Sequence, residues 1–190
     1  VFTVRVFLNG RPTQATTSVT NSPGTVVNDD TIGDGVRVWS NGDNAKSSND
    51  SYASSFYGMS ASYITSYLKA TNFGFSIPSG ATISGITARV ERKAAAGSFY
   101  SIDTYVDYSV VIVKSDGTFG STNKASAVKV ATTDETILYG GSSDTWGETW
   151  SASDINNSKF GIAVSYRYAC GDDPDPNQFF IDHISISIEY

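Results

Sequence analysis

Residues 179–190 read FFIDHISISIEY, and this stretch decides the fold. From residue 184 onward apolar and polar side chains alternate without a break. One face carries Ile184, Ile186, Ile188 and Tyr190, and the other carries Ser185, Ser187 and Glu189. Because successive side chains of a β-strand point to opposite sides, this period of two predicts a final strand whose isoleucines face a core.

The same period of two recurs along the chain. It is found in residues 1–8, 81–93, 102–114 and 160–167, and in 102–114 it places Val106, Tyr108, Val110 and Ile112 on one face. A further strand is expected at 72–76, and a bulge at Gly85, where the alternation breaks. The one helical signal is a single turn at 153–157 capped by Ser153. About eight to eleven short strands separated by turns predict an all-β fold, an antiparallel β-sandwich or jelly roll.

The chain has 190 residues, which suits a single sandwich domain. Residues 1–20 are expected to form an N-terminal strand segment, a candidate assembly arm. Residues 21–190 are expected to form the β-sandwich domain. Within it, residues 21–51 are interpreted as a long ordered loop with a short strand at 36–39 and Trp39 as its anchor.

The charge pattern excludes several classes of partner. The net charge is −6, and the 13 lysines and arginines are scattered without a basic run. Phosphate binding needs clustered cations, so neither nucleic acid nor an anionic membrane surface is an expected partner. No apolar stretch approaches the roughly 20 residues of a membrane-spanning helix, so no membrane insertion is expected. The single cysteine, Cys170, allows no disulfide within the chain.

No catalytic residue is predicted. His183 is the only histidine, and its neighbour Asp182 should point to the opposite face of the strand. The Gly-x-Ser-x-Gly motif of serine hydrolases is missing, and one histidine plus one cysteine cannot make a zinc site. We therefore expect the chain not to be an enzyme. Asp182 is expected to be half-buried and paired with Arg89 or Arg92, since a buried charge needs a partner.

Calcium is the one metal that the sequence leaves open. Oxygen-rich loops contain Asp29, Asp30, Asp172, Asp173 and Asp175. Calcium takes six to eight oxygen ligands, which such loops can supply. The spacing is not that of an EF-hand, and aspartates also favour turns for purely local reasons. No other cofactor is expected.

Several segments between residues 22 and 190 carry a resemblance. They include SPGT at 22–25, WSN at 39–41, FGFSIPSGATISGI at 73–86, YGGSSDTWG at 139–147 and IDHI at 181–184. Together they resemble a poorly characterised family of β-sandwich domains from tailed-phage structural proteins and bacterial exported proteins. The resemblance implies a virion or cell-surface setting and a structural or adhesive role. It supplies no catalytic motif.

The N-terminal strand lies outside this resemblance and is apolar on nearly both faces. Its apolar residues are Val1, Phe2, Val4, Val6, Phe7 and Leu8. An exposed strand of this kind invites pairing with another chain. Two hypotheses stay open at this point: the strand joins a neighbouring subunit's sheet, or it pairs within its own sandwich.

Two functions of different classes follow. The first is a non-enzymatic structural subunit of a virion (head or tail decoration, or fibre) or of an extracellular filament, whose partners are copies of itself or other subunits of the particle. The alternative is a carbohydrate-binding module for surface glycans, with calcium as the one metal it could use. For that module Trp39, Trp146 and Trp150 are the candidate sugar-stacking residues; the interpretation weighed against this, and favoured by the sequence, is that they are core or loop anchors.

Overall fold

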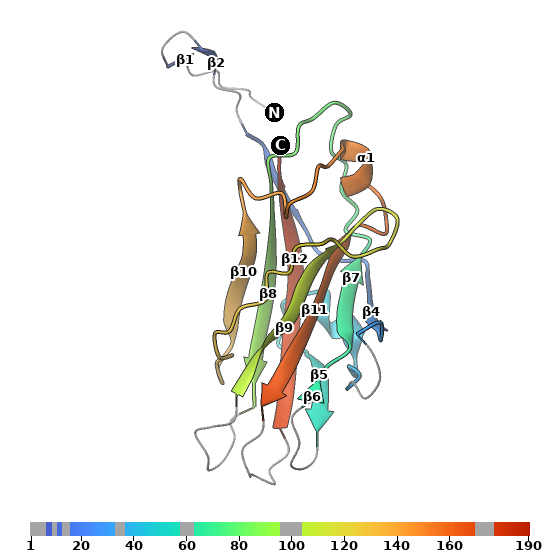
Figure 1. Cartoon of the computed structure of the whole chain (residues 1–190), viewed down its shortest axis with the longest axis vertical. Helices are drawn as coiled ribbons and strands as arrows, with labels where there is room; N and C mark the ends of the chain where they lie inside the picture. Colours follow the sequence, from blue (N-terminus) through green and yellow to red (C-terminus); the bar gives the residue numbers. More distant parts are fainter. Residues whose placement is uncertain are drawn as a thin grey trace.

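A computed structural model describes residues 7–8, 11–12, 16–32, 37–57, 63–95, 104–169 and 177–190. Two five-stranded antiparallel sheets lie one behind the other (Figure 1). The apolar residues of both sheets form one continuous core between them. The predicted all-β sandwich is therefore confirmed.

Sheet I is built around the long C-terminal strand β12 (Asn177–Glu189). On one side β12 pairs with β8 (Gly85–Ala94), which in turn pairs with the edge strand β10 (Glu135–Gly141). On the other side β3 (Ser18–Asn21) and β5 (Ala53–Tyr57) pair with opposite ends of β12. All of these pairings are antiparallel.

Sheet II is built around β11 (Gly161–Ala169). One side of β11 pairs with β9 (Thr104–Val113), and the other side pairs with β7 (Tyr67–Thr71) and the short β6 (Tyr63–Ile64). Strand β4 (Thr25–Asp29) completes the sheet by pairing with β7. Residues 25–29 thus form a strand inside the segment that the sequence analysis interpreted as a loop.

The helical elements are short. The 3-10 helix η1 (Gly42–Ala45) lies beside the gap between β3 and β5, where Lys46 forms a bridge to His183. The single α-turn α1 (Ala152–Ile155) has Ser151 as its N-cap, in a reciprocal capping box with Asp154. The predicted helical turn is therefore present, but its cap lies two residues earlier than expected. In the described segments no helix is long and apolar enough to cross a membrane.

The N-terminal strands form a hairpin of their own. Strand β1 (Phe7–Leu8) pairs with β2 (Arg11–Pro12), and neither belongs to sheet I or sheet II. Pairing of this part of the arm within its own sandwich is thus not observed. The other predicted arm residues, Val1, Phe2, Val4 and Val6, lie outside the described residues. The sandwich itself begins at Thr17, which exchanges two backbone hydrogen bonds with the last residue, Tyr190.

Alternation predicted the core where strands are regular. Ile184, Ile186 and Ile188 are fully buried, as are Ile86 and Val90 on β8. Residues 72–76 form no strand, because Asn72 and Gly74 both have positive φ and bend the chain. This segment still buries Phe73 and Phe75 and packs them against the core.

Two bulges shift which side chains face inward. Between β9 and β11 the register slips so that Tyr108 has no opposite residue, and its side chain is 41% exposed. Asp107 consequently points into the sandwich, where the sequence analysis had placed Val106 and Tyr108. The second bulge leaves Asp182 unpaired between Ile181 and His183 on β12. The bulge predicted at Gly85 is absent; Gly85 starts β8, and a Cβ there would lie 2.3 Å from a Ser142 backbone atom.

Candidate binding surface

The three tryptophans are core residues. Trp39, Trp146 and Trp150 are at most 9% exposed. Each indole N–H donates a hydrogen bond of 2.9–3.0 Å to a backbone carbonyl. Buried rings with satisfied polar atoms offer no face to a sugar, so the prediction that they stack on glycans was wrong and their alternative role as core anchors holds.

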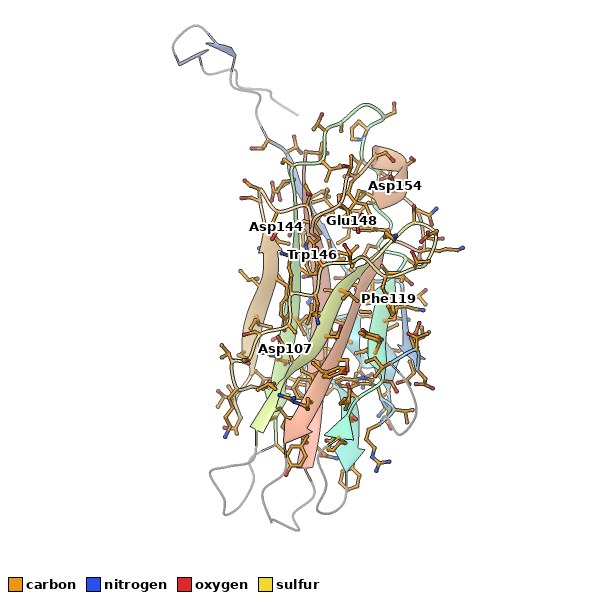
Figure 2. All side chains as sticks on the ribbon, in the orientation of Figure 1. Asp107, Phe119, Asp144, Trp146, Glu148 and Asp154 are labelled. Atoms are coloured by element: carbon orange, nitrogen blue, oxygen red, sulfur yellow. The ribbon has the colours of Figure 1, made fainter. Side chains whose placement is uncertain are left out.

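The Gly140–Gly147 stretch of the resemblance also has a structural explanation. Gly140 has φ +80°, and a Cβ there would lie 2.6 Å from the indole nitrogen of Trp146. The carboxylate of Asp144 accepts the backbone N–H of Trp146 and pairs with Lys124, whose ammonium lies 5.1 Å from the Trp146 ring. Figure 2 shows Asp144 and Trp146 together near one end of β10. These residues hold a turn against the core.

The calcium candidates stay a prediction. The Asp29 carboxylate forms an ion pair with Lys69, which together with hydrogen bonds from Thr31 outweighs burial and lowers its pKa. Asp30 is exposed. The part of the chain that the structure describes contains no group of three or more carboxylate, histidine or cysteine side chains arranged for a metal. Asp172, Asp173 and Asp175 lie outside the described residues.

His183 and Asp182 have separate partners. The Nε2 atom of His183 lies 2.8 Å from the hydroxyl of Ser22, and burial lowers its pKa although Glu91 and Asp182 oppose that shift. Asp182 is buried and accepts the backbone N–H of Asn49 at 3.1 Å. The prediction that Asp182 pairs with an arginine was therefore wrong. Arg89 donates a hydrogen bond to the hydroxyl of Ser187, and Arg92 is buried between the sheets, where it binds Asp107.

One exposed and two partly buried aromatic rings lie on the outer face of sheet I. Phe56 on β5 is 53% exposed and lies opposite Gln178 of β12, diagonal to Phe180. Phe180 packs edge-to-face against Tyr52, with the ring centroids 5.6 Å apart. Side chains of alternate strand positions face the same side, so these rings share one surface.

Polar groups border these rings. The Lys93 ammonium lies 2.7 Å from the Tyr52 hydroxyl and 3.1 Å from the Asp134 carboxylate. The Tyr52 hydroxyl also donates to Asp134 at 3.1 Å and lies 3.2 Å from Asp50. The hydrogen bond to Tyr52 raises the pKa of Lys93, so its ammonium is charged at neutral pH. We call Tyr52, Phe56, Phe180, Lys93 and Asp134 the aromatic face.

The hydroxyl of Tyr52 is held in its neutral form. Its hydrogen bond with Lys93 lowers the pKa, but burial and the Asp134 carboxylate outweigh it, so the net shift is upward. A neutral phenol can both donate and accept a hydrogen bond. The aromatic face therefore offers apolar ring surface together with a cation, a carboxylate and a hydroxyl.

The opposite outer face is arranged differently. On sheet II, Phe119 covers Tyr67 with the ring centroids 4.7 Å apart, and Val111 and Val113 pack below them. Beside this small core lies an open groove of about 300 Å³. Its lining residues are Lys69, Thr71, Val113, Asp116, Gly117, Ser158 and Lys159. This groove contains no exposed aromatic ring, and one of its two lysines is already paired with Asp29.

Comparisons with known proteins identify no family and return distant structural neighbours. No family model matches the chain, and no curated protein matches it. A chain from the structure of infectious bursal disease virus (Gx strain) is 13% identical, with a TM-score of 0.42 over 94% of this chain. A CBM4 structure is 11% identical, with a TM-score of 0.38 over 89% of this chain and 92% of its own. This chain spans only 33% of the viral chain. Both are β-sandwich folds, and the resemblance to the phage and bacterial family stays a prediction.

Proposed function

We propose that this chain is a non-catalytic β-sandwich module that binds neutral glycans on the aromatic face. One observation carries the proposal: Phe56 is 53% exposed beside two further aromatic rings, on a surface bordered by hydrogen-bonding groups. Large apolar side chains gathered on a surface mark an interaction site rather than a folding requirement. The setting that suits such a module is a virion or an extracellular surface.

The ligand class follows from the chemistry of this surface. A sugar ring has apolar C–H faces that stack on aromatic rings and hydroxyls around its rim that need hydrogen-bond partners. Lys93, Asp134 and the Tyr52 hydroxyl supply donors and acceptors within reach of the rings. Lys93 is already neutralised by Asp134, so the surface favours a neutral sugar over an anionic one.

The test is affinity electrophoresis against soluble mixed-linkage β-glucan, xylan and galactomannan, after a glycan array has selected the linkage. Phe56→Ala should lower the affinity about tenfold, which corresponds to about 1.4 kcal/mol of lost stacking. Its stability should change by less than about 0.5 kcal/mol, because Phe56 is largely exposed. Val128→Ala is the matched control, since Val128 is 62% exposed and lies outside the aromatic face. The proposal fails if no glycan binds, or if both variants weaken binding equally.

A second candidate is a structural subunit of a virion or extracellular filament. The observation in its favour is the hairpin of β1 and β2, which pairs with neither sheet of its own sandwich. Such a segment is free to pair with a neighbouring subunit. Deleting residues 1–15 should leave a folded sandwich that no longer enters the native particle, as seen by electron microscopy. A deletion that assembles normally would reject this role for the arm.

A further inference from the structure

Strand β3 is weakly attached to the core. Among the strands that the structure describes in the two sheets, it alone has no buried residue: all four residues of Ser18–Asn21 are exposed or partly buried. Val19 is its one apolar side chain and lies at the margin of the core. Its other partly buried residue, Asn21, is polar and donates its side-chain N–H to the Phe73 carbonyl at 2.8 Å. Elements with so few buried apolar contacts are the ones that open locally in a folded protein.

The slot that β3 occupies on β12 is specific for the β3 sequence. The Thr20 hydroxyl lies 2.6 Å from the hydroxyl of Ser187, which is only 3% exposed, and Ser18 donates to the Glu189 carboxylate at 2.7 Å. Residues 17–21 also supply the backbone partners of β12 up to the last residue of the chain. A strand that fills this slot must carry hydroxyls at alternate positions, because a buried hydroxyl without a partner is costly.

The connection from β3 to β4 is short and stiff. It consists of Ser22, Pro23 and Gly24, and it crosses from sheet I to sheet II. Pro23 is buried, and the backbone N–H of Gly24 donates to the Asn72 carbonyl at 2.9 Å, so the β4 side of this hinge is fixed. Proline also restricts the residue before it, Ser22, to extended conformations. An opened β3 therefore has few conformations, which reduces the entropy lost when another chain binds it.

We infer that β3 is exchanged between two copies of this chain, so that residues 17–21 of each copy pair with β12 of the other. An exchanged element makes the same contacts between copies that it makes within one, so the dimer keeps the hydrogen bonds of β3 and only the hinge at 22–24 changes conformation. The slot on β12 selects this occupant because β3 already satisfies it. The inference does not depend on glycan binding, and it gives the structural-subunit candidate a contact made by described residues.

Disulfide trapping between two single variants tests the exchange. Thr20 and Ser187 lie opposite each other in the register of β3 and β12, and paired strands bring such Cα atoms to about 4.5–5.5 Å, within disulfide range. In a Cys170→Ser background, chains with Thr20→Cys and chains with Ser187→Cys are mixed at high concentration and mildly oxidised. The mixture should give about fivefold more covalent dimer than either variant alone, because only the mixture places two thiols in one slot.

Two controls accompany this mixture. Val128→Cys mixed with Ser187→Cys is the control for an exposed cysteine, since Val128 is 62% exposed and lies outside β3. The double variant Thr20→Cys/Ser187→Cys should oxidise to a covalent dimer at high concentration, whereas a chain that keeps β3 on its own β12 closes its disulfide within the monomer. Equal cross-linking of the two mixtures, or a double variant that is monomeric at every concentration, would overturn the inference.

Sedimentation of chains without added cysteines provides an independent readout. The native protein should show a concentration-dependent monomer–dimer equilibrium, and inserting Gly-Ser-Gly after Pro23 should shift it about tenfold toward monomer, because a longer hinge favours closure within one chain. Deleting residues 1–15 leaves β3 in place, so the dimer should persist, which separates this contact from pairing through the hairpin of β1 and β2. A native chain that is monomeric at every concentration, or a deletion that abolishes the dimer, would overturn the inference.

Discussion

Arg92 and Lys93 are neighbours on β8, and they make the same kind of cluster on opposite sides of sheet I. Inside the sandwich, Arg92 forms an ion pair with Asp107 and donates to the Tyr139 hydroxyl at 3.0 Å. Outside, Lys93 contacts Asp134 and the hydroxyl of Tyr52. Each cluster therefore contains a cation, a carboxylate and a phenol.

The difference between them is access to solvent. The Arg92 side chain is fully buried. The Asp107 carboxylate accepts hydrogen bonds from Arg92, from the Tyr139 hydroxyl and from a backbone N–H, so all three hydrogen bonds of this carboxylate lie inside the sandwich. Figure 2 shows Asp107 between the sheets. The side chains of Lys93 and Asp134 are partly exposed. The inner cluster therefore holds the two sheets together. The outer cluster has the same kinds of groups, but a ligand can replace its hydrogen bonds beside the aromatic rings.

The strongest test of this comparison is Arg92→Met. The substitution keeps a long side chain but leaves the Asp107 carboxylate buried without a cation, which costs about 3–5 kcal/mol. Urea unfolding should show the loss as a lower midpoint with an unchanged m-value. Arg92→Met/Asp107→Leu should recover part of the loss, because the only carboxylate that then lacks its arginine is Glu135, which is partly exposed. A single variant within about 1 kcal/mol of the native protein would contradict a structural role for the buried cluster.

Lys93→Met is the matched variant on the outside. Exposed ion pairs contribute little, so the free energy of unfolding should change by less than about 1 kcal/mol. Glycan affinity should fall about fivefold, since one donor beside the rings is lost and Tyr52 is less firmly placed. Titration calorimetry with the polysaccharide selected above would measure this. An unchanged affinity would remove Lys93 from the aromatic face.

The smallest expected effect comes from mild acid. Burial lowers the pKa of His183, on the outer side of sheet I, below its usual 6.5. As the pH falls, His183 is protonated in the unfolded chain before it is protonated in the folded chain. Above pH 6.5 the histidine is neutral in both states and costs no stability. Stability falls as the pH drops from 6.5 toward the lower native pKa. His183→Gln should make the urea unfolding midpoint less dependent on pH between pH 7 and 5.5, whereas Lys93→Met should leave that dependence unchanged. A native profile that is already flat would contradict the shift.

Alternation predicted the strands because one face of each must be buried. It placed Ile184, Ile186 and Ile188 correctly, and it gave the sandwich as a whole. It failed at the bulges, since one extra residue reverses every later side chain. Tyr108 was therefore expected inside, and Asp107, which forms the buried ion pair, was not anticipated.

The aromatic face was missed for a different reason. Tyr52 and Phe180 are 128 positions apart and meet only because β5 pairs with β12. Residue type also led to a wrong choice of binding residues. Tryptophan is a common sugar-stacking residue, but the three tryptophans of this chain are buried in the core. Register between distant strands and the burial of individual rings are tertiary properties that local pattern does not encode. The closeness of Tyr52, Phe56 and Tyr57 in the sequence was the only available signal.

The paired backbone of Thr17 and Tyr190 has a practical consequence. Both ends of the sandwich leave from one pole of the molecule, whereas Phe180 lies ten residues back along β12, about 33 Å away at the usual strand rise. A tag or a solid support attached at either terminus would therefore hold the molecule by the pole farther from its rings. Immobilised in this way, the chain presents Phe56 and its neighbours outward to whatever is washed across it.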